Sequence, residues 1–136
     1  MVAGHVPVCG VIEIDQGHRE LHRHLEDMSD LWRQGSASDV LHACLTSVRD
    51  VACRHFDEEI SLLYTLGISS QKHVDSHNAI LRTINLWVQD MAGITDHSRW
   101  FALVDSLEQM FFDHEVVEDR AYFRILAQRD APRLAS

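Results

Sequence analysis

The sequence has almost no proline: Pro7 and Pro132 lie near its two ends. Nothing between residues 8 and 131 therefore forbids long helices. The chain also lacks any uninterrupted run approaching about 18 apolar residues, which excludes a membrane-spanning helix. The first ten residues, MVAGHVPVCG, have neither the basic nor the apolar region of a secretory signal peptide. We therefore expect a cytoplasmic protein.

Cysteine and lysine are also scarce. The three cysteines, Cys9, Cys44 and Cys53, are an odd number without framework spacing, which indicates reduced and partly buried thiols that fill core space. Lys72 is the single lysine, and 21 acidic residues against 12 basic ones give a formal charge of −9. Such an acidic surface repels phosphate groups, so we expect neither a nucleic-acid nor a membrane partner.

Hydrophobic residues and histidine are abundant. Hydrophobic residues make up 46% of the chain, enough for a real core, and 136 residues match the size of one domain. Ten histidines are far more than a chain of this length usually has, and histidine is the commonest metal ligand. The sequence thus predicts a single globular domain, residues 1–136, in which the histidines are the first candidates for function.

Apolar residues recur with helical spacing in four segments that short polar breaks separate. Each break contains one glycine (Gly35, Gly67 or Gly93), followed by Ser or Asp residues that can cap the next helix. Four amphipathic helices with short connections predict an all-α fold, an antiparallel up-down-up-down four-helix bundle. The predicted ranges are 1–14 for an extended N-terminal arm and about 16–34, 38–66, 70–91 and 98–129 for the helices.

Histidines interrupt the apolar stripe of every predicted helix, and carboxylates accompany them on two of the four helices. Pairs four residues apart lie about 6 Å apart on one helix face, a separation that suits metal ligands. Chance supplies about one His-xxx-His and one His-xxx-Glu pair in such a chain, but not easily an inward imidazole on all four helices. Burying these groups without a partner would be costly, so we infer a buried metal centre. The residues are His18; His55 and Glu59; His73 and His77; and His114, which Glu115, Glu118 and Asp119 follow.

The type of ligand narrows the choice of metal. Five imidazoles and two or more carboxylates are too many for one tetrahedral zinc ion, and no cysteine joins them. Calcium and magnesium sites avoid imidazole. A mixed nitrogen and oxygen set shared by two ions favours a non-haem di-iron centre over di-manganese or mixed metals.

These motifs resemble those of the hemerythrin family, in particular the bacterial hemerythrin-like proteins and domains. The segment CGVIEIDQGHREL is similar to the family's G-V-x-x-I-D-x-x-H-R-x-L start. HFDEE (55–59) resembles its H-F-x-x-E element, HVDSH (73–77) its H-x-x-x-H, and HEVVED (114–119) its terminal H-x-x-x-x-D. Four motifs in the family's order make the resemblance specific, and it extends from about residue 10 to about residue 122.

The resemblance implies a ligand set for two iron ions, which cycle between Fe²⁺ and Fe³⁺. His73, His77 and His114 would hold one iron, and His18 and His55 the other. Glu59 and Asp119 would bridge the two together with an oxo or hydroxo group. The iron with fewer histidines would have the open position for O₂. The function implied is reversible O₂ binding for carrying, storage or sensing, in the last case beside a fused or partner signalling domain.

The chain also departs from the family pattern. The spacing from His55 to His73 is one residue short, and Met110 stands where a tryptophan is common. Glu115 replaces an aliphatic residue of the O₂ pocket, so it either stays solvated at a bundle edge or reaches the open iron or its ligand. The second case favours a peroxidase-like or NO/peroxide-detoxifying enzyme. Glu118 could replace Asp119 as the bridge, although we favour Asp119.

Overall fold

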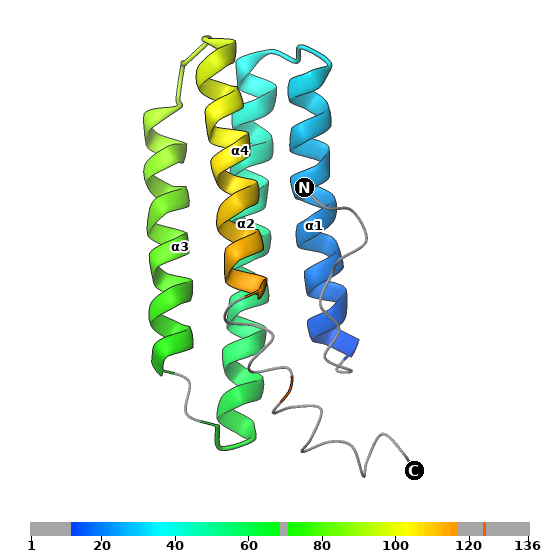
Figure 1. Ribbon diagram of the computed structural model, residues 1–136, viewed down its shortest axis with the longest axis vertical. Coiled ribbons are helices and arrows are strands. Elements are labelled where there is room, and N and C mark those ends of the chain that lie inside the picture. The colour runs from blue at the N-terminus through cyan, green and yellow to red at the C-terminus, as the bar shows by residue number, and fades with distance from the viewer. Residues whose placement is uncertain (1–11, 69–70, 117–123, 125–136) are drawn as a thin grey trace.

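The computed structural model describes residues 12–68, 71–116 and 124, and the helices among them form an all-α four-helix bundle. Helices α1 and α2 pack together, α3 packs on α2 and α4, and α4 closes the ring against α1. Figure 1 shows consecutive helices running in alternating directions, which confirms the predicted up-down-up-down arrangement. The helices span Ile12–Arg33 (α1), Ser38–Thr65 (α2), Gln71–Asp90 (α3) and His97–His114 (α4).

Glycines in the left-handed backbone conformation lie between consecutive helices. Gly35, Gly67 and Gly93 have φ angles of 73°, 68° and 75°, a region that costs other residues free energy and glycine almost none. Asp96 then caps α4, because its side chain accepts a hydrogen bond from the backbone N–H of Ser98. The predicted breaks are therefore confirmed at all three glycines.

The α1 helix begins earlier than we predicted. Residues 12–14, which we assigned to the arm, form its first turn. Ile14 is buried against Leu63, and it precedes His18 by four residues and Leu21 by seven. The apolar stripe of the helix thus continues one turn further back than the predicted start at residue 16, and burial of that turn explains the correction. Residues 1–11 lie outside the described part of the chain, as do residues 117–123 and 125–129 of the fourth predicted helix.

The main hydrophobic core occupies the end of the bundle where α1 meets α2 and α3 meets α4. Burial of each large side chain there stabilises the fold by about 1.5–3 kcal/mol. The Trp100 indole is fully buried and donates a hydrogen bond to the carbonyl of Ile94 at 2.8 Å, so its one polar atom is satisfied. Members of this core include Leu25, Met28, Leu41, Leu45, Ile84, Met91, Trp100, Leu103 and Leu107.

The two described cysteines differ in their burial. Cys44 is half-buried against the core, and burial, with the nearby Asp27, raises the pKa of its thiol. Cys53 is exposed, so the prediction that it fills core space was wrong, and Cys9 lies outside the described residues.

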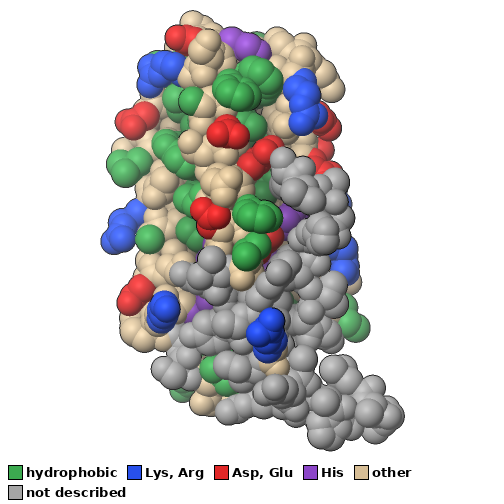
Figure 2. Space-filling model, in the orientation of Figure 1, with side chains coloured by type: hydrophobic (Ala, Val, Ile, Leu, Met, Phe, Trp, Pro, Cys, Tyr) green, Lys and Arg blue, Asp and Glu red, His purple; other side chains and the backbone are tan. Residues whose placement is uncertain are grey.

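On the face in Figure 2, acidic and basic side chains are interspersed with hydrophobic ones. Among the described helices, none is both long and apolar enough to cross a membrane.

Candidate metal centre

Six of the predicted ligands come together inside the bundle, at the end where α1 begins and α4 ends. Each helix contributes at least one of them from its inward face, because the ligands follow the same register as the apolar residues. All six are at most 5% exposed, which is rare for titratable side chains. They are His18 on α1, His55 and Glu59 on α2, His73 and His77 on α3, and His114 on α4.

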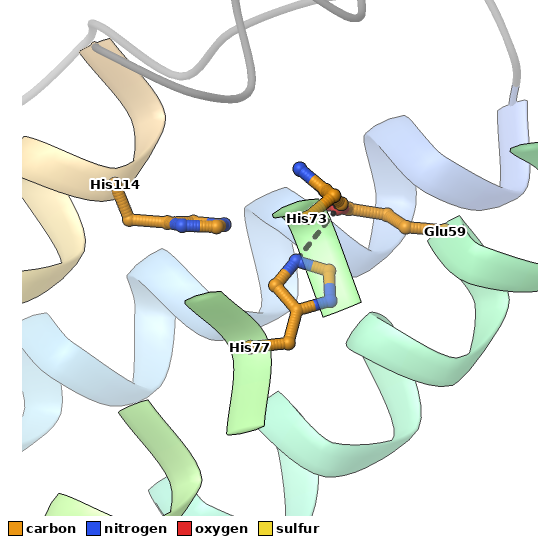
Figure 3. Close-up of side chains that lie close together, drawn as sticks. All are labelled: Glu59, His73, His77 and His114. Atoms are coloured by element: carbon orange, nitrogen blue, oxygen red, sulfur yellow. Dashed lines mark hydrogen bonds and ion pairs between the residues drawn. The ribbon is translucent and has the colours of Figure 1, made fainter. Parts of the chain in front are cut away.

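The Glu59 carboxylate lies between two pairs of imidazoles. Its Oε1 is 2.9 Å from Nε2 of His18 and 2.7 Å from Nε2 of His55. Its Oε2 is 2.9 Å from Nε2 of His73 and 3.3 Å from Nε2 of His77. Figure 3 shows the second oxygen facing the histidines of α3, with His114 approaching from α4. Each oxygen of Glu59 thus contacts a different pair of imidazole rings.

The donor atoms separate into two groups that share Glu59. In each group, the donor atoms all lie within 4.8 Å of one another, close enough to surround a single ion. One group has three histidines and the other has two, and every residue of both is buried. The groups are Glu59 with His73, His77 and His114, and Glu59 with His18 and His55. This arrangement can hold two metal ions joined by one carboxylate.

The protonation states inside the cluster suit metal binding. Burial by itself raises the pKa of Glu59, but contacts with four imidazoles outweigh burial and hold that pKa well below its usual range. Burial lowers the pKa of His77, although the Glu59 carboxylate opposes this shift. At neutral pH Glu59 is therefore ionised and His77 is neutral, which are the forms that ligate metals.

Several buried ring nitrogens lack a hydrogen bond. Both nitrogens of His55 and both of His77 are buried without a well-aligned hydrogen-bond partner among the described residues, although Nε2 of each lies near Glu59. A buried polar atom left in this state costs roughly 1–3 kcal/mol. Metal ions ligated by the Nε2 atoms would remove that cost at the two Nε2 nitrogens, so the cluster fits the metal centre that the sequence predicts.

Neighbouring side chains hold the imidazoles in place. Ser76 Oγ forms a hydrogen bond with Nδ1 of His114 at 3.2 Å, which leaves the other ring nitrogen to face the cluster. The Phe56 ring stacks on His77 with centroids 3.8 Å apart and an interplanar angle of 7°. Neither contact is evident from the motifs. Ser76 precedes His77 in the sequence, and Phe56 follows His55.

Glu115 is buried but lies outside both donor groups. Its Oε1 is 2.6 Å from Nε2 of His22, a residue one turn after His18 on α1. The His22 side chain is only 12% exposed, so this contact lies largely away from solvent. The described structure therefore directs the Glu115 carboxylate to His22 and does not place it at a bundle edge in solvent.

The other predicted ligands and histidines divide into two sets. Asp119 and the alternative bridge Glu118 lie outside the described residues, so their roles stay predictions. His24 and His42 form hydrogen bonds with backbone carbonyls of Glu20 and Val88, at 2.9 Å and 2.7 Å. His97 stacks on Trp32. These contacts give each of the three histidines a structural role.

No protein-family model, curated protein or solved structure matches this chain. The resemblance to the hemerythrins therefore remains a proposal that depends on the motifs. The case for a metal centre has independent support, because it depends on donor atoms whose positions are described above.

Proposed function

We propose that this chain is a non-haem di-iron protein of the hemerythrin type that binds O₂ reversibly, for carrying, storage or sensing. One observation supports this most directly: the two oxygens of Glu59 each face a separate group of buried histidines. A carboxylate that serves two groups of rings is the arrangement expected of a ligand bridging two ions.

The donor set favours iron. Imidazole with carboxylate suits iron, manganese and zinc, whereas a thiolate would favour zinc or an iron–sulfur cluster. Neither described cysteine, Cys44 or Cys53, belongs to either donor group. Five imidazoles around one carboxylate exceed what a tetrahedral zinc ion needs. Two ions therefore account for the set with the fewest unused donors, and the resemblance of the motifs to the hemerythrins favours iron among these metals.

The residues have distinct roles in this proposal. His73, His77 and His114 would hold one iron, and His18 and His55 would hold the other, with Glu59 and Asp119 as shared carboxylate ligands beside an oxo or hydroxo group. When bound, the iron pair supplies the electrons that reversible O₂ binding requires. The two-histidine half has fewer protein ligands, so it leaves a coordination position for O₂. Phe56, which lies beside His114, and Phe111, which packs against Phe56, keep water away because both are buried.

Metal content and the visible spectrum test the proposal. The full chain, reconstituted anaerobically with Fe²⁺, should bind about two iron ions. On exposure to air it should develop an absorption band that disappears under vacuum and returns with O₂. Fewer than about one iron per chain would overturn the di-iron proposal. Two bound irons with rapid, irreversible oxidation would overturn reversible O₂ binding alone.

A peroxidase-like or NO/peroxide-detoxifying enzyme is the second candidate, and the pair formed by Glu115 and His22 favours it. The Glu115 carboxylate is 4% exposed and follows the ligand His114 directly. A carboxylic group beside an imidazole is a common arrangement for proton delivery.

We expect Glu115→Leu to separate the two candidates. If the chain is an enzyme, the variant should retain about two irons and lose peroxide turnover by roughly 10²-fold, the usual contribution of an acid–base group. His22→Gln, which keeps a hydrogen-bond donor near Glu115, is the matched variant and should lose less. Unchanged turnover in Glu115→Leu would contradict an enzymatic role for this carboxylate.

A further inference from the structure

One turn of α3 contacts all the other protein groups of the three-histidine half of the centre, which consists of Glu59, His73, His77 and His114. His73 and His77 lie on this turn and contact Oε2 of Glu59, at 2.9 Å and 3.3 Å. Ser76 lies three residues after His73 and directly before His77, so it stands beside them on the helix surface. Its Oγ forms the 3.2 Å hydrogen bond with Nδ1 of His114 on α4. The turn that carries two of the ligands thus also contacts the third.

His114 stands at the end of its helix. α4 ends at His114, and Glu115 and Val116 continue the chain in the wider π-helical form. The His114 ring packs among other rings: its centroid is 4.9 Å from that of His77 and 5.5 Å from that of Phe56, with interplanar angles of 56° and 59°. Figure 3 shows this ring extending from α4 toward the histidines of α3. Backbone and packing therefore bring the ring to the centre.

Packing does not distinguish the two edges of an imidazole. A half-turn about the Cβ–Cγ bond exchanges Nδ1 with Cδ2 and Nε2 with Cε1, and a ring nitrogen and a ring carbon are nearly the same size. The turned ring of His114 would fill the same space, but a carbon would stand where Nε2 stands now. The hydrogen bond does distinguish the edges, because Ser76 Oγ bonds to Nδ1 and has no such bond with Cδ2. Only the observed orientation both satisfies this hydrogen bond and leaves the buried Nε2 for an ion.

We propose that Ser76 is a positioning residue that fixes the ring orientation of His114 and thereby makes this histidine a ligand of the three-histidine half. The inference rests on the metal centre proposed above, and it gives a reason why the two halves differ. With Nε2 bound to an ion, the proton of the neutral ring is on Nδ1, so His114 donates and the Ser76 hydroxyl accepts. Without the hydroxyl, the ring is free to turn over, and this half keeps two histidine ligands, the same number as the other half. Ser76 thus keeps the three-histidine half filled and leaves the open coordination position to the two-histidine half.

The two steps of Co²⁺ binding test the role of Ser76. The metal-free full chain is titrated with Co²⁺ against a competing chelator, and the visible absorption of the bound ions gives two binding constants. Ser76→Ala should weaken one step by about 10–100-fold, the usual effect of removing a group that orients a metal-bound histidine, and should change the other step little. The ratio of the two constants is the decisive quantity, because a bundle that the substitution merely loosened would weaken both steps together. Ser76→Thr keeps the hydroxyl and should restore the ratio.

A double-variant cycle tests whether Ser76 acts through His114. In a His114→Gln background, the further change Ser76→Ala should alter neither constant, because the ring that the hydroxyl orients is gone. Thr83→Ala is the matched control: it removes a hydroxyl of α3 that bonds to the carbonyl of Ala79, and it should leave both constants unchanged.

Two results would overturn the positioning role and leave the metal centre intact. One is an equal weakening of both steps by Ser76→Ala, and the other is an undiminished effect of Ser76→Ala in the His114→Gln background. If the unaltered chain binds no Co²⁺, the metal centre itself fails, and the positioning role fails with it.

Discussion

Glu59→Gln should lose both metal ions. The carboxylate offers one oxygen to His18 and His55 and the other to His73 and His77. Glutamine keeps one oxygen, but its NH₂ group is a donor that cannot ligate an ion, so one group of rings loses its shared ligand outright. The remaining neutral oxygen is a poor bridge between two cations. Iron content after anaerobic reconstitution should fall from about two ions per chain to near zero, with affinity reduced roughly a hundredfold or more.

The same variant should also weaken the metal-free fold. Removing one partner from a buried charged network costs about 3 kcal/mol, because the polar groups left behind stay buried. Chemical denaturation of the metal-free chain measures this loss, and circular dichroism confirms that the helices persist before metal is added. Asp57→Asn, an exposed change two residues earlier on α2, is the matched control and should keep both ions. Two tightly bound irons in Glu59→Gln would contradict the bridging role.

Gly17→Ala should lose one of the two ions. In an ordinary helix interior, alanine is more favourable than glycine by about 0.5–1 kcal/mol. Here the added Cβ would overlap Nδ1 of His55 and lie 3.2 Å from its Cγ, so the ring must move. The ring has little room, since His18 lies on another side with centroids 4.3 Å apart and Glu59 contacts Nε2. Metal analysis should give about one ion per chain, held by the three-histidine group.

The expected change in the free energy of unfolding is opposite to the usual effect of replacing glycine by alanine in a helix. A helix-favouring substitution should here lower the free energy of unfolding of the metal-free chain, because overpacking a well-filled site commonly costs about 1–3 kcal/mol. Arg19→Ala, an exposed change two residues later on α1, should keep both ions and full stability. A Gly17→Ala chain that is more stable and still binds two ions would show that His55 adapts freely.

Helical spacing was enough to predict most of the fold and which side chains face inward. His18, His73 and His114 share a stripe with apolar neighbours, so a regular helix had to bury them together with that stripe. The start of α1 was missed because Ile14 was counted among the apolar residues of an extended N-terminal arm. Its contact with Leu63 of α2 is a tertiary one that spacing along a single helix cannot show.

The contacts between helices could not be predicted in the same way. Spacing predicts the face on which Glu115 lies, but not that the facing residue of α1 is His22. Nor does a motif show that one oxygen of Glu59 faces α1 and the other α3, because that depends on how far apart the helices pack. The close approach of Gly17 to the His55 ring could not be predicted for the same reason, since that ring belongs to α2.

The two ends of the bundle are held together for different reasons. At one end, apolar side chains such as Leu45 and Trp100 are buried as soon as the helices meet. At the other end, five buried imidazoles surround a single carboxylate, and its two oxygens contact rings from α1, α2 and α3. We therefore expect the apolar end to form first and to bring the ligand-bearing turns into register before any ion arrives. The metal would find the polar end of the bundle already aligned and would tighten it last.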